Sequence, residues 1–216
     1  VRGHQSIALA KPDAVTAFMK WFRDDLKTNR AAGWLRDTGT PGILTALNRA
    51  SGLPTRNFRE GVFEGAQKIS FDAIKANIMV GRRGCYACTL RCKPEVASAK
   101  AFKVDSLYGG PEYETLASLG SDCGIDNLEA IAKGNELCNA YGLDTISTGA
   151  TIAFAMECFE QGIITEKQTD GLKLGFGQAE AMVQMVEMIA RKQGIGKVLA
   201  EGTARAAKAF GRGAEE

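Results

Sequence analysis

The sequence predicts a mainly α protein, an irregular multi-helix bundle that carries a Cys-rich loop. Apolar residues recur at helical spacing along most of the chain, Gly and Pro separate these stretches, and no alternating strand of convincing length occurs. The 216 residues suffice for one substantial core or two small helical units without disulfides. We expect the end of a preceding domain or a linker over 1–11 and a helical region over 12–216, with two helical subdomains dividing near 120–145.

The upstream half is predicted to hold three helices. The first runs from Pro12 to about Leu26, where apolar residues follow helical spacing. The second covers 41–51, with a Pro near its start and a Gly after its end. The third covers 70–80, after an irregular stretch at 53–58, and leads into a loop rich in Cys and basic residues over 81–93.

The downstream half is more regular, and its predicted helices carry capping residues. The D-x-x-E sequence from Asp126 to Glu129 has the form of a capping box before a helix that runs to about Tyr141. Gly142 is placed to end that helix, and Asp144 can cap the next one, over about 145–161. Further helices are predicted to start at Thr165 and to cover 178–193 and 196–210.

Composition excludes several classes of function. A net charge of +2 provides no electrostatic footprint for nucleic acid. Apolar runs such as 151–156 are far shorter than a bilayer requires, and no signal peptide is recognisable, so we expect a cytoplasmic protein that does not enter a membrane. The single His4 excludes a site with two imidazoles within the chain.

Three of the six cysteines, Cys85, Cys88 and Cys92, lie within eight residues in a C-x2-C-x3-C spacing. Three thiolates on one loop can bind three corners of a cubane iron–sulfur cluster and leave one iron for another ligand. Neighbouring Arg and Lys residues are expected to lower the thiol pKa values. A zinc site and unrelated free thiols are the alternatives, and no second C-x2-C completes a zinc set.

The other three cysteines have different surroundings. Cys138 and Cys158 fall inside predicted helices among apolar neighbours, so we expect them in the core. Cys123, in a Ser-Asp-Cys-Gly loop, is a candidate fourth cluster ligand.

The stretch from Asn139 to Asp144 joins a helix end, a tight turn and a new helix start. Such a junction exposes backbone N–H groups, and with its polar side chains it could bind a heterocycle with amide-like edges. A plain Gly-terminated helix followed by an Asp-capped one is the alternative interpretation.

Four segments, in this order, resemble the tungsten-containing aldehyde ferredoxin oxidoreductase family. They are Pro54 to Phe58, Cys85 to Cys92, Gly110 to Glu114, and the long N-x-x-G-L-D-T-I-S-T-G stretch from Asn139 to Gly149, which continues into Ala153 to Glu157. The resemblance spans nearly the whole chain, from about Pro12 to about Ala209.

The resemblance implies an enzyme that oxidises aldehydes to carboxylic acids at a tungsten or molybdenum bis-pyranopterin centre. Electrons would leave through a [4Fe-4S] cluster to ferredoxin or a similar acceptor. The implied cluster ligands are Cys85, Cys88 and Cys92, and the implied pterin-binding residues are Asn139, Gly142, Leu143 and Asp144.

Further residues acquire implied roles by the same resemblance. Glu114 matches an acidic residue close to the metal and is our candidate for proton transfer, with Glu112 as a second candidate. Arg56 and Asn57 are expected near the cofactor, without an assigned role.

The chain also departs from the family pattern. Asn139 stands where the family usually has Asp, which removes a charge from the pterin site. The D-x-x-G-L-C motif that supplies the fourth cluster cysteine, a catalytic His and a β-rich N-terminal domain are all missing. We therefore expect an internal piece that is inactive alone and that needs the N- and C-terminal portions of the same enzyme.

The implied partners are an aldehyde, ferredoxin and, in some members of the family, a second copy of the subunit. Two alternative functions remain at this point. One is a related tungsten enzyme that reduces an aromatic acyl-CoA. The other is a non-catalytic helical module with a structural iron–sulfur or zinc site.

Overall fold

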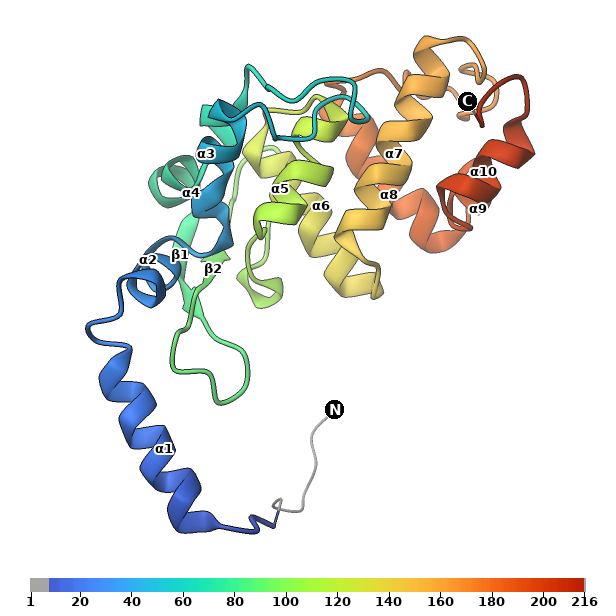
Figure 1. The fold of residues 1–216 in the computed structure, drawn as a ribbon. Coiled ribbons are helices and arrows are strands. Elements are labelled where there is room, and N and C mark those ends of the chain that lie inside the picture. Colours follow the sequence, from blue (N-terminus) through green and yellow to red (C-terminus); the bar gives the residue numbers. More distant parts are fainter. Residues whose placement is uncertain (1–7, 216) are drawn as a thin grey trace.

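The structure, a computed structural model, describes residues 8–215, so His4 and most of the predicted linker lie outside the described residues. Helices dominate it (Figure 1), which confirms the mainly α class. They are α1 (Pro12–Asp25), α2 (Arg30–Thr38), α3 (Leu44–Arg49), α4 (Phe71–Asn77), α5 (Tyr113–Ser118), α6 (Leu128–Tyr141), α7 (Thr145–Glu160), α8 (Ala179–Arg191), α9 (Gly196–Leu199) and α10 (Thr203–Phe210). Short 3₁₀ turns connect them at η1 (Thr40–Ile43), η2 (Ala66–Ile69), η3 (Ser106–Tyr108) and η4 (Ser121–Cys123). Within the described residues, no helix combines the length and the apolar character needed to cross a membrane.

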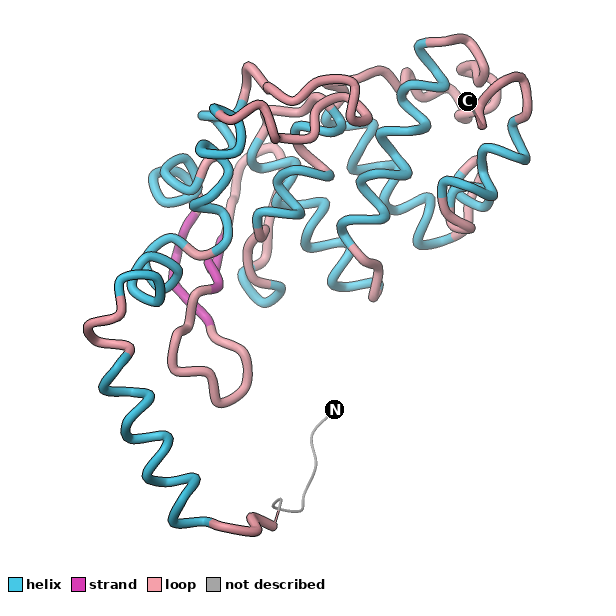
Figure 2. The backbone as a smooth tube through the Cα atoms, viewed as in Figure 1, coloured by secondary structure: helices cyan, strands magenta, loops and turns pink. Residues whose placement is uncertain are grey.

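An antiparallel hairpin interrupts the helices (Figure 2), formed by β1 (Met79–Arg83) and β2 (Lys93–Val96). The predictions of a helix up to residue 80 and of no strand are therefore wrong in this segment. These strands are five and four residues long and lack an alternating apolar pattern, so periodicity does not reveal them. They are stabilised by pairing with each other, with Met79 opposite Val96 and Arg83 opposite Lys93. The Cys-rich loop is the connection between the two strands.

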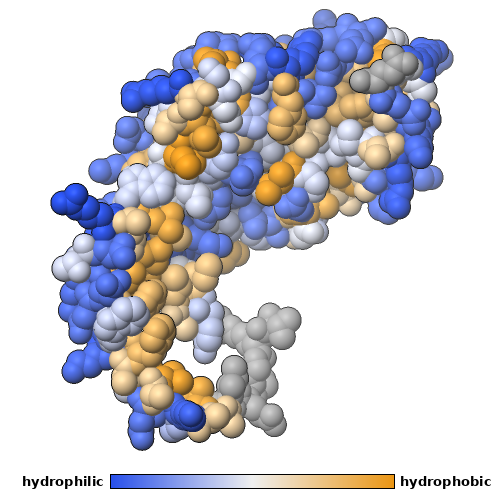
Figure 3. All heavy atoms as spheres, in the orientation of Figure 1, coloured by the Kyte–Doolittle hydropathy of each residue, from blue (hydrophilic) through white to orange (hydrophobic). Residues whose placement is uncertain are grey.

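The first helix extends away from the rest of the molecule (Figure 1). None of the α1 side chains is buried, and Phe18 and Trp21 are more than half exposed. Figure 3 shows apolar side chains gathered along this helix. The following helix, α2, is absent from the predictions, because it has only nine residues and contains Gly33, which has a low helix propensity. Asn29 caps this helix, since its side chain accepts a hydrogen bond from the Ala32 N–H at 3.1 Å.

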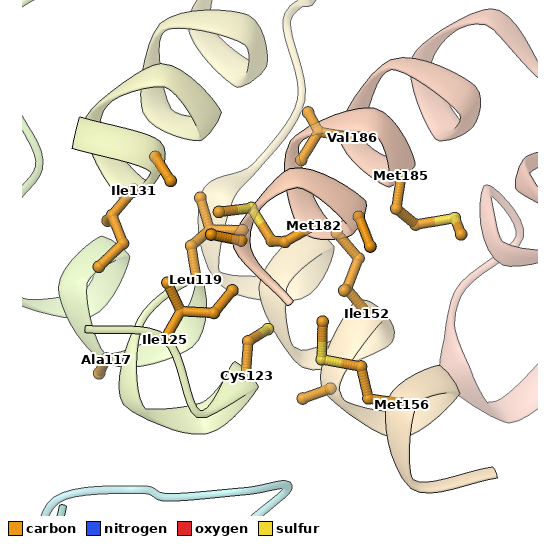
Figure 4. Packing of buried hydrophobic residues seen from close by; sticks show 14 of the residues in the cluster. Ala117, Leu119, Cys123, Ile125, Ile131, Ile152, Met156, Met182, Met185 and Val186 are labelled. Carbon is orange, nitrogen blue, oxygen red and sulfur yellow. The ribbon is translucent and has the colours of Figure 1, made fainter. Parts of the chain in front are cut away.

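The core lies where α5, α6, α7 and α8 meet, and Figure 4 shows Leu119, Ile152 and Met182 packed there. One cluster of buried apolar residues extends from Leu44 to Ala207. The predicted division into two subdomains near 120–145 stays a prediction.

A close approach between α5 and α7 fixes their relative position. A Cβ on Gly149 of α7 would lie 2.5 Å from the Ser118 carbonyl carbon, so only glycine fits without movement. The Ser118 hydroxyl donates to the carbonyls of Glu114 at 2.7 Å and Thr145 at 3.1 Å. The helix that carries Glu114 is therefore attached to the first residue of α7.

Two predicted helices of the downstream half differ from the structure. The segment from Thr165 forms consecutive turns, because Asp170 and Gly171 adopt φ values of 56° and 86° and reverse the chain. Residues 196–210 form two helices, α9 and α10, since Gly202 at φ 87° separates them.

The predicted capping box before α6 is also displaced by one residue. Asn127 is the capping residue and accepts from the Ala130 N–H at 3.1 Å. Asp126 instead pairs with Lys68 at 2.6 Å, which ties α6 to η2.

Candidate cofactor and cluster site

The junction between α6 and α7 has the geometry predicted for it. Gly142 adopts φ 74° and ends α6, and the Leu143 N–H donates to the Cys138 carbonyl at 2.8 Å. Asp144 caps α7 by accepting from the Ser147 N–H at 2.8 Å and its hydroxyl at 2.6 Å. These hydrogen bonds hold the pKa of the Asp144 carboxyl below its usual value.

A cavity of about 370 Å³ lies beside this junction, and we call it the junction cavity. Asn139, Leu143 and Asp144 line it, together with Lys93 of β2 and Glu112 just before α5. Three elements far apart in the sequence thus meet around one space, whose volume lies in the range of small-molecule sites.

Two amides of α6 give the junction cavity its polar character. The Asn139 side chain donates through Nδ2 to the Asn135 carbonyl at 2.9 Å and to its Oδ1 at 3.2 Å. Asn135 also lines the cavity, is only 4% exposed, and its Nδ2 has no hydrogen-bond partner in the described protein. A buried donor without an acceptor, in the wall of a polar cavity, fits a heterocycle that offers acceptor atoms.

The hairpin loop displays the three clustered thiols. Cys85 and Cys88 are exposed, and Cys92, the residue before β2, is half-buried. The Cys88 N–H donates to the Cys85 carbonyl at 3.0 Å, and Ala87 and Arg91 adopt φ values of 57° and 50°, which bend the loop tightly.

The donor set of this loop fits a soft metal centre, because three thiols lie on one turn-rich segment. Within residues 8–215, however, no three or more His, Cys, Asp or Glu side chains converge as a metal-binding group. The loop therefore supplies the donor chemistry, and the ligand geometry stays a prediction.

The pKa of Cys88 is lowered as predicted, although not by basic side chains, and the pKa of Cys92 shifts in the opposite direction. The pKa of Cys88 is lowered by hydrogen bonds from the backbone N–H groups of Arg91 and Leu90. The pKa of Cys92 is raised, first by burial and then by the negative charge of Glu112. Backbone geometry, rather than guanidinium charge, dominates at Cys88.

Two arginines of β1 hold the hairpin in place. Arg82 donates to the Arg36 carbonyl at 2.6 Å and to the Asp37 carbonyl near the end of α2. Arg83 pairs with Glu95 at 2.8 Å. Both side chains thus make structural contacts, and neither contributes to the lowered pKa of Cys88.

The other cysteines lie in the interior. The Cys123 thiol is fully buried and donates to the carbonyls of Ser118 at 3.3 Å and Gly149 at 3.6 Å, away from solvent. It does not meet the hairpin thiols in a metal-binding group, so it is not placed as a fourth cluster ligand. Cys138 and Cys158 are buried as predicted, and burial raises the pKa of each thiol to about 11.

A second cavity, of about 490 Å³, lies on the thiol side of Glu112, and we call it the thiol-side cavity. Cys92, Lys93, Glu112 and Glu114 line it. Glu112 accepts a hydrogen bond from the Thr40 hydroxyl. Since Lys93 and Glu112 line both cavities, the thiol-bearing hairpin and the helix junction are neighbours. Of these two cavities, Glu114 lines only the thiol-side cavity.

Arg56 and Asn57 of the Pro54–Phe58 stretch lie outside the two cavities, so their expected place near the cofactor stays a prediction. Asn57 lines a separate cavity of about 690 Å³ formed with α7 and α10, and its side chain donates to Glu157. Arg56 pairs with Glu60 at 3.0 Å and with Glu64. The structure does not bring these two residues to either cavity described above.

Sequence reasoning missed Asn135, and it assigned Lys93 only to the basic flank of the thiols. Asn135 precedes Asn139 by four residues, which places both side chains on one helix face, so helical spacing could have found it. Lys93 has no such local signal, because only the pairing of β1 with β2 brings it to the junction.

The fold and the two adjoining cavities define a helical domain in which a thiol-rich hairpin lies beside a polar pocket. The chain belongs to the aldehyde ferredoxin oxidoreductase family, since the family profile described as "Aldehyde ferredoxin oxidoreductase, domains 2 & 3" matches residues 17–216.

Individual relatives agree with this membership. The chain is 34% identical, over 97% of its length, to the tungsten-containing aldehyde ferredoxin oxidoreductase of Pyrococcus horikoshii, and 38% identical, over 84%, to that of Thermococcus kodakarensis. It spans 35% and 29% of these proteins, about a third of their length. A "WOR-like subunit" of an aliphatic sulfonate oxidoreductase from Pyrococcus furiosus is 34% identical over 79% of the chain and 27% of that protein.

Among solved structures, the BamBC active-site complex of benzoyl coenzyme A reductase shares the fold. The match has a TM-score of 0.70 at 21% identity and covers 100% of this chain and 34% of the other.

Proposed function

We propose that this chain is the helical, cofactor-binding part of an enzyme that oxidises aldehydes to carboxylic acids. The observation that carries the proposal is the pair Lys93 and Glu112, which lines both the junction cavity and the cavity that holds Cys92. A redox cofactor in the first cavity and a cluster at the thiols would then be near neighbours. Family membership and the tungsten-containing relatives support this assignment.

Two sets of residues would hold the redox groups. Cys85, Cys88 and Cys92 would bind three irons of a [4Fe-4S] cluster, the fourth ligand coming from outside the chain. The stretch from Asn139 to Asp144 would hold one pterin of a tungsten (or molybdenum) bis-pyranopterin. When bound, the metal supplies the two-electron redox chemistry.

The chain's own acidic residues would manage the proton. Glu114, exposed in the first turn of α5, is our proposed proton-transfer group. Glu112 accepts a hydrogen bond from the Thr40 hydroxyl and lines both cavities. This hydrogen bond holds the carboxylate in the wall between the two cavities.

The hairpin loop is the proposed exit for electrons. Its thiols Cys85 and Cys88 lie at the molecular surface, and Arg91 and Lys93 beside them are exposed. Exposed positive charge there would orient an acidic electron acceptor such as ferredoxin.

The test uses the complete enzyme, with Cys88→Ala compared with Cys158→Ala. We expect aldehyde-dependent dye reduction and iron content to fall together in Cys88→Ala, because a cluster ligand is lost. Cys158→Ala truncates a buried thiol and should keep its iron. Full iron content with full activity in Cys88→Ala would refute the cluster assignment.

Substrate class is tested separately on the same complete enzyme. We expect simple aldehydes to be turned over faster than an aromatic acyl-CoA or an aliphatic sulfonate. Preference for an aromatic acyl-CoA or an aliphatic sulfonate would refute the proposed aldehyde substrate. It would not contradict the proposed cluster and pterin sites.

A further inference from the structure

The Asn135 amide is the one buried side-chain nitrogen or oxygen of the described residues that has no hydrogen-bond partner. It sits on the second turn of α6, among buried residues of the same helix, and it lines the junction cavity. Burying an amide N–H without an acceptor destabilises a protein, because the group loses its hydrogen bonds to water and gains none in return. Such a group indicates a missing partner at that place.

The neighbouring Asn139 fixes the orientation of this amide. Its Nδ2 donates to both the carbonyl and the Oδ1 of Asn135, at 2.9 and 3.2 Å. Since Oδ1 of Asn135 faces Asn139, its Nδ2 lies on the other edge of the same planar amide and is not used by Asn139. Turning the amide over would place two donors against each other, so the present orientation is the favoured one.

The other polar groups close by leave the donor available. The Thr115 and Thr145 hydroxyls are 2.9 Å apart and bond each other. Asp144 accepts both donors of Ser147 on one oxygen, Oδ2, and neither this carboxylate nor the two hydroxyls accepts a hydrogen bond from Asn135 Nδ2. An acceptor for Asn135 is therefore best supplied by a molecule that enters the cavity.

We propose that Asn135 is a further cofactor-binding residue, whose Nδ2–H donates to an acceptor atom, a ring nitrogen or carbonyl, of the heterocycle in the junction cavity. This inference rests on the proposed function, in which that heterocycle is a pterin. Asn139 acts on the same bond as a positioning residue, because it holds the Asn135 amide in orientation.

The experiment measures pterin release from the complete, cofactor-loaded enzyme, followed as the fluorescent oxidation product. Asn135→Leu keeps the approximate size of the side chain and removes the donor. One lost hydrogen bond of ordinary strength corresponds to roughly tenfold faster release. Asn77→Leu is the matched control, because Asn77 is an exposed helical Asn that donates to the carbonyl four residues earlier at 2.8 Å.

The cofactor-free form of the same enzyme provides a second readout. There Asn135→Leu should melt at the same temperature as the wild type or higher, since an unsatisfied buried donor has been removed. Faster release together with an undiminished melting temperature distinguishes loss of a ligand contact from general damage. If Asn135→Leu does not fold, Asn135→Asp, which keeps the acceptor for Asn139 and removes the donor, is measured in its place and should also release pterin faster.

Two outcomes separate the inference from the proposed function. Unchanged release from the Asn135 variant, with faster release from Asp144→Ala, would overturn the role of Asn135 and leave the cofactor assignment intact. Absence of pterin from the wild-type complete enzyme would overturn both.

Discussion

Asp122 offers a quantitative test of the buried polar structure beneath the Pro54–Phe58 stretch. Its carboxylate is 1% exposed and accepts from the Phe58 N–H at 3.0 Å, while its carbonyl accepts from the Asn57 N–H at 3.0 Å. Residues 56, 57 and 58 all have positive φ, between 49° and 62°, so these contacts hold a strained turn. The perturbation is Asp122→Asn, which keeps an acceptor for Phe58 and cannot ionise.

The magnitude follows from the pKa of this carboxyl. Burial, with a smaller effect of the Glu157 charge, raises the pKa from 3.8 to about 6. Between these two values the folded state binds more protons than the unfolded state, so stability falls as pH rises through that window. The shift corresponds to at most about 3 kcal/mol of destabilisation above pH 6. Asp122→Asn should therefore be more stable than the wild type at about pH 8 and close to it at about pH 4.

The assay is native-state amide hydrogen exchange of Phe58 in the complete protein, which reports opening of this turn even when global unfolding is not two-state. The protection of Phe58 should fall with rising pH in the wild type, after correction for intrinsic exchange, and stay level in Asp122→Asn. Asp126→Asn, at a partly exposed carboxylate, is the control and should follow the wild type. A pH-independent difference between variant and wild type, or a less protected variant at about pH 8, would refute the reasoning.

Two further predictions concern the packing that positions the site. Gly149→Ala places a Cβ 2.5 Å from the Ser118 carbonyl carbon, and this backbone atom cannot move aside as a side chain can. We therefore expect the free energy of unfolding to fall by about 1–3 kcal/mol, offset in part by the higher helix propensity of Ala. Gly175→Ala, with no atom within 4 Å, should be nearly neutral in the same thermal-unfolding measurement; equal effects of the two variants would contradict the close approach. Arg82→Met removes two hydrogen bonds to carbonyls at the end of α2, so we expect faster amide hydrogen exchange in the 84–92 loop. Arg49→Met, at an exposed residue, is the control, and equal exchange rates in the two variants would contradict this anchoring role of Arg82.

Local signals in the sequence predicted the parts of the fold that depend on near neighbours. Gly142 and Asp144 ended and began helices as expected, because cap geometry is decided within a few residues. The same local reasoning failed where the chain pairs over a longer distance. Met79 joins a strand because Val96 lies opposite it, and the turns after Thr165 follow from positive φ at Asp170.

The candidate site shows the same division. The cysteine spacing and the Asn139–Asp144 motif are readable from the sequence, and the structure places the latter in a cavity wall. Their proximity is not readable, because it depends on Lys93 in β2 and Glu112 before α5 meeting between them. The position of Asn57 is likewise not readable, because its turn lies beside α7 and α10, and the expectation that it lies near the cofactor stays a prediction.

The central claim is that the hairpin thiols and the junction cavity hold the two redox groups of one enzyme. Elemental and pterin analysis of the purified complete protein tests it most directly. We predict tungsten or molybdenum, pterin, and about four irons per chain with the broad visible absorption of a [4Fe-4S] cluster. A colourless protein with one zinc per chain, no iron and no pterin would contradict the claim.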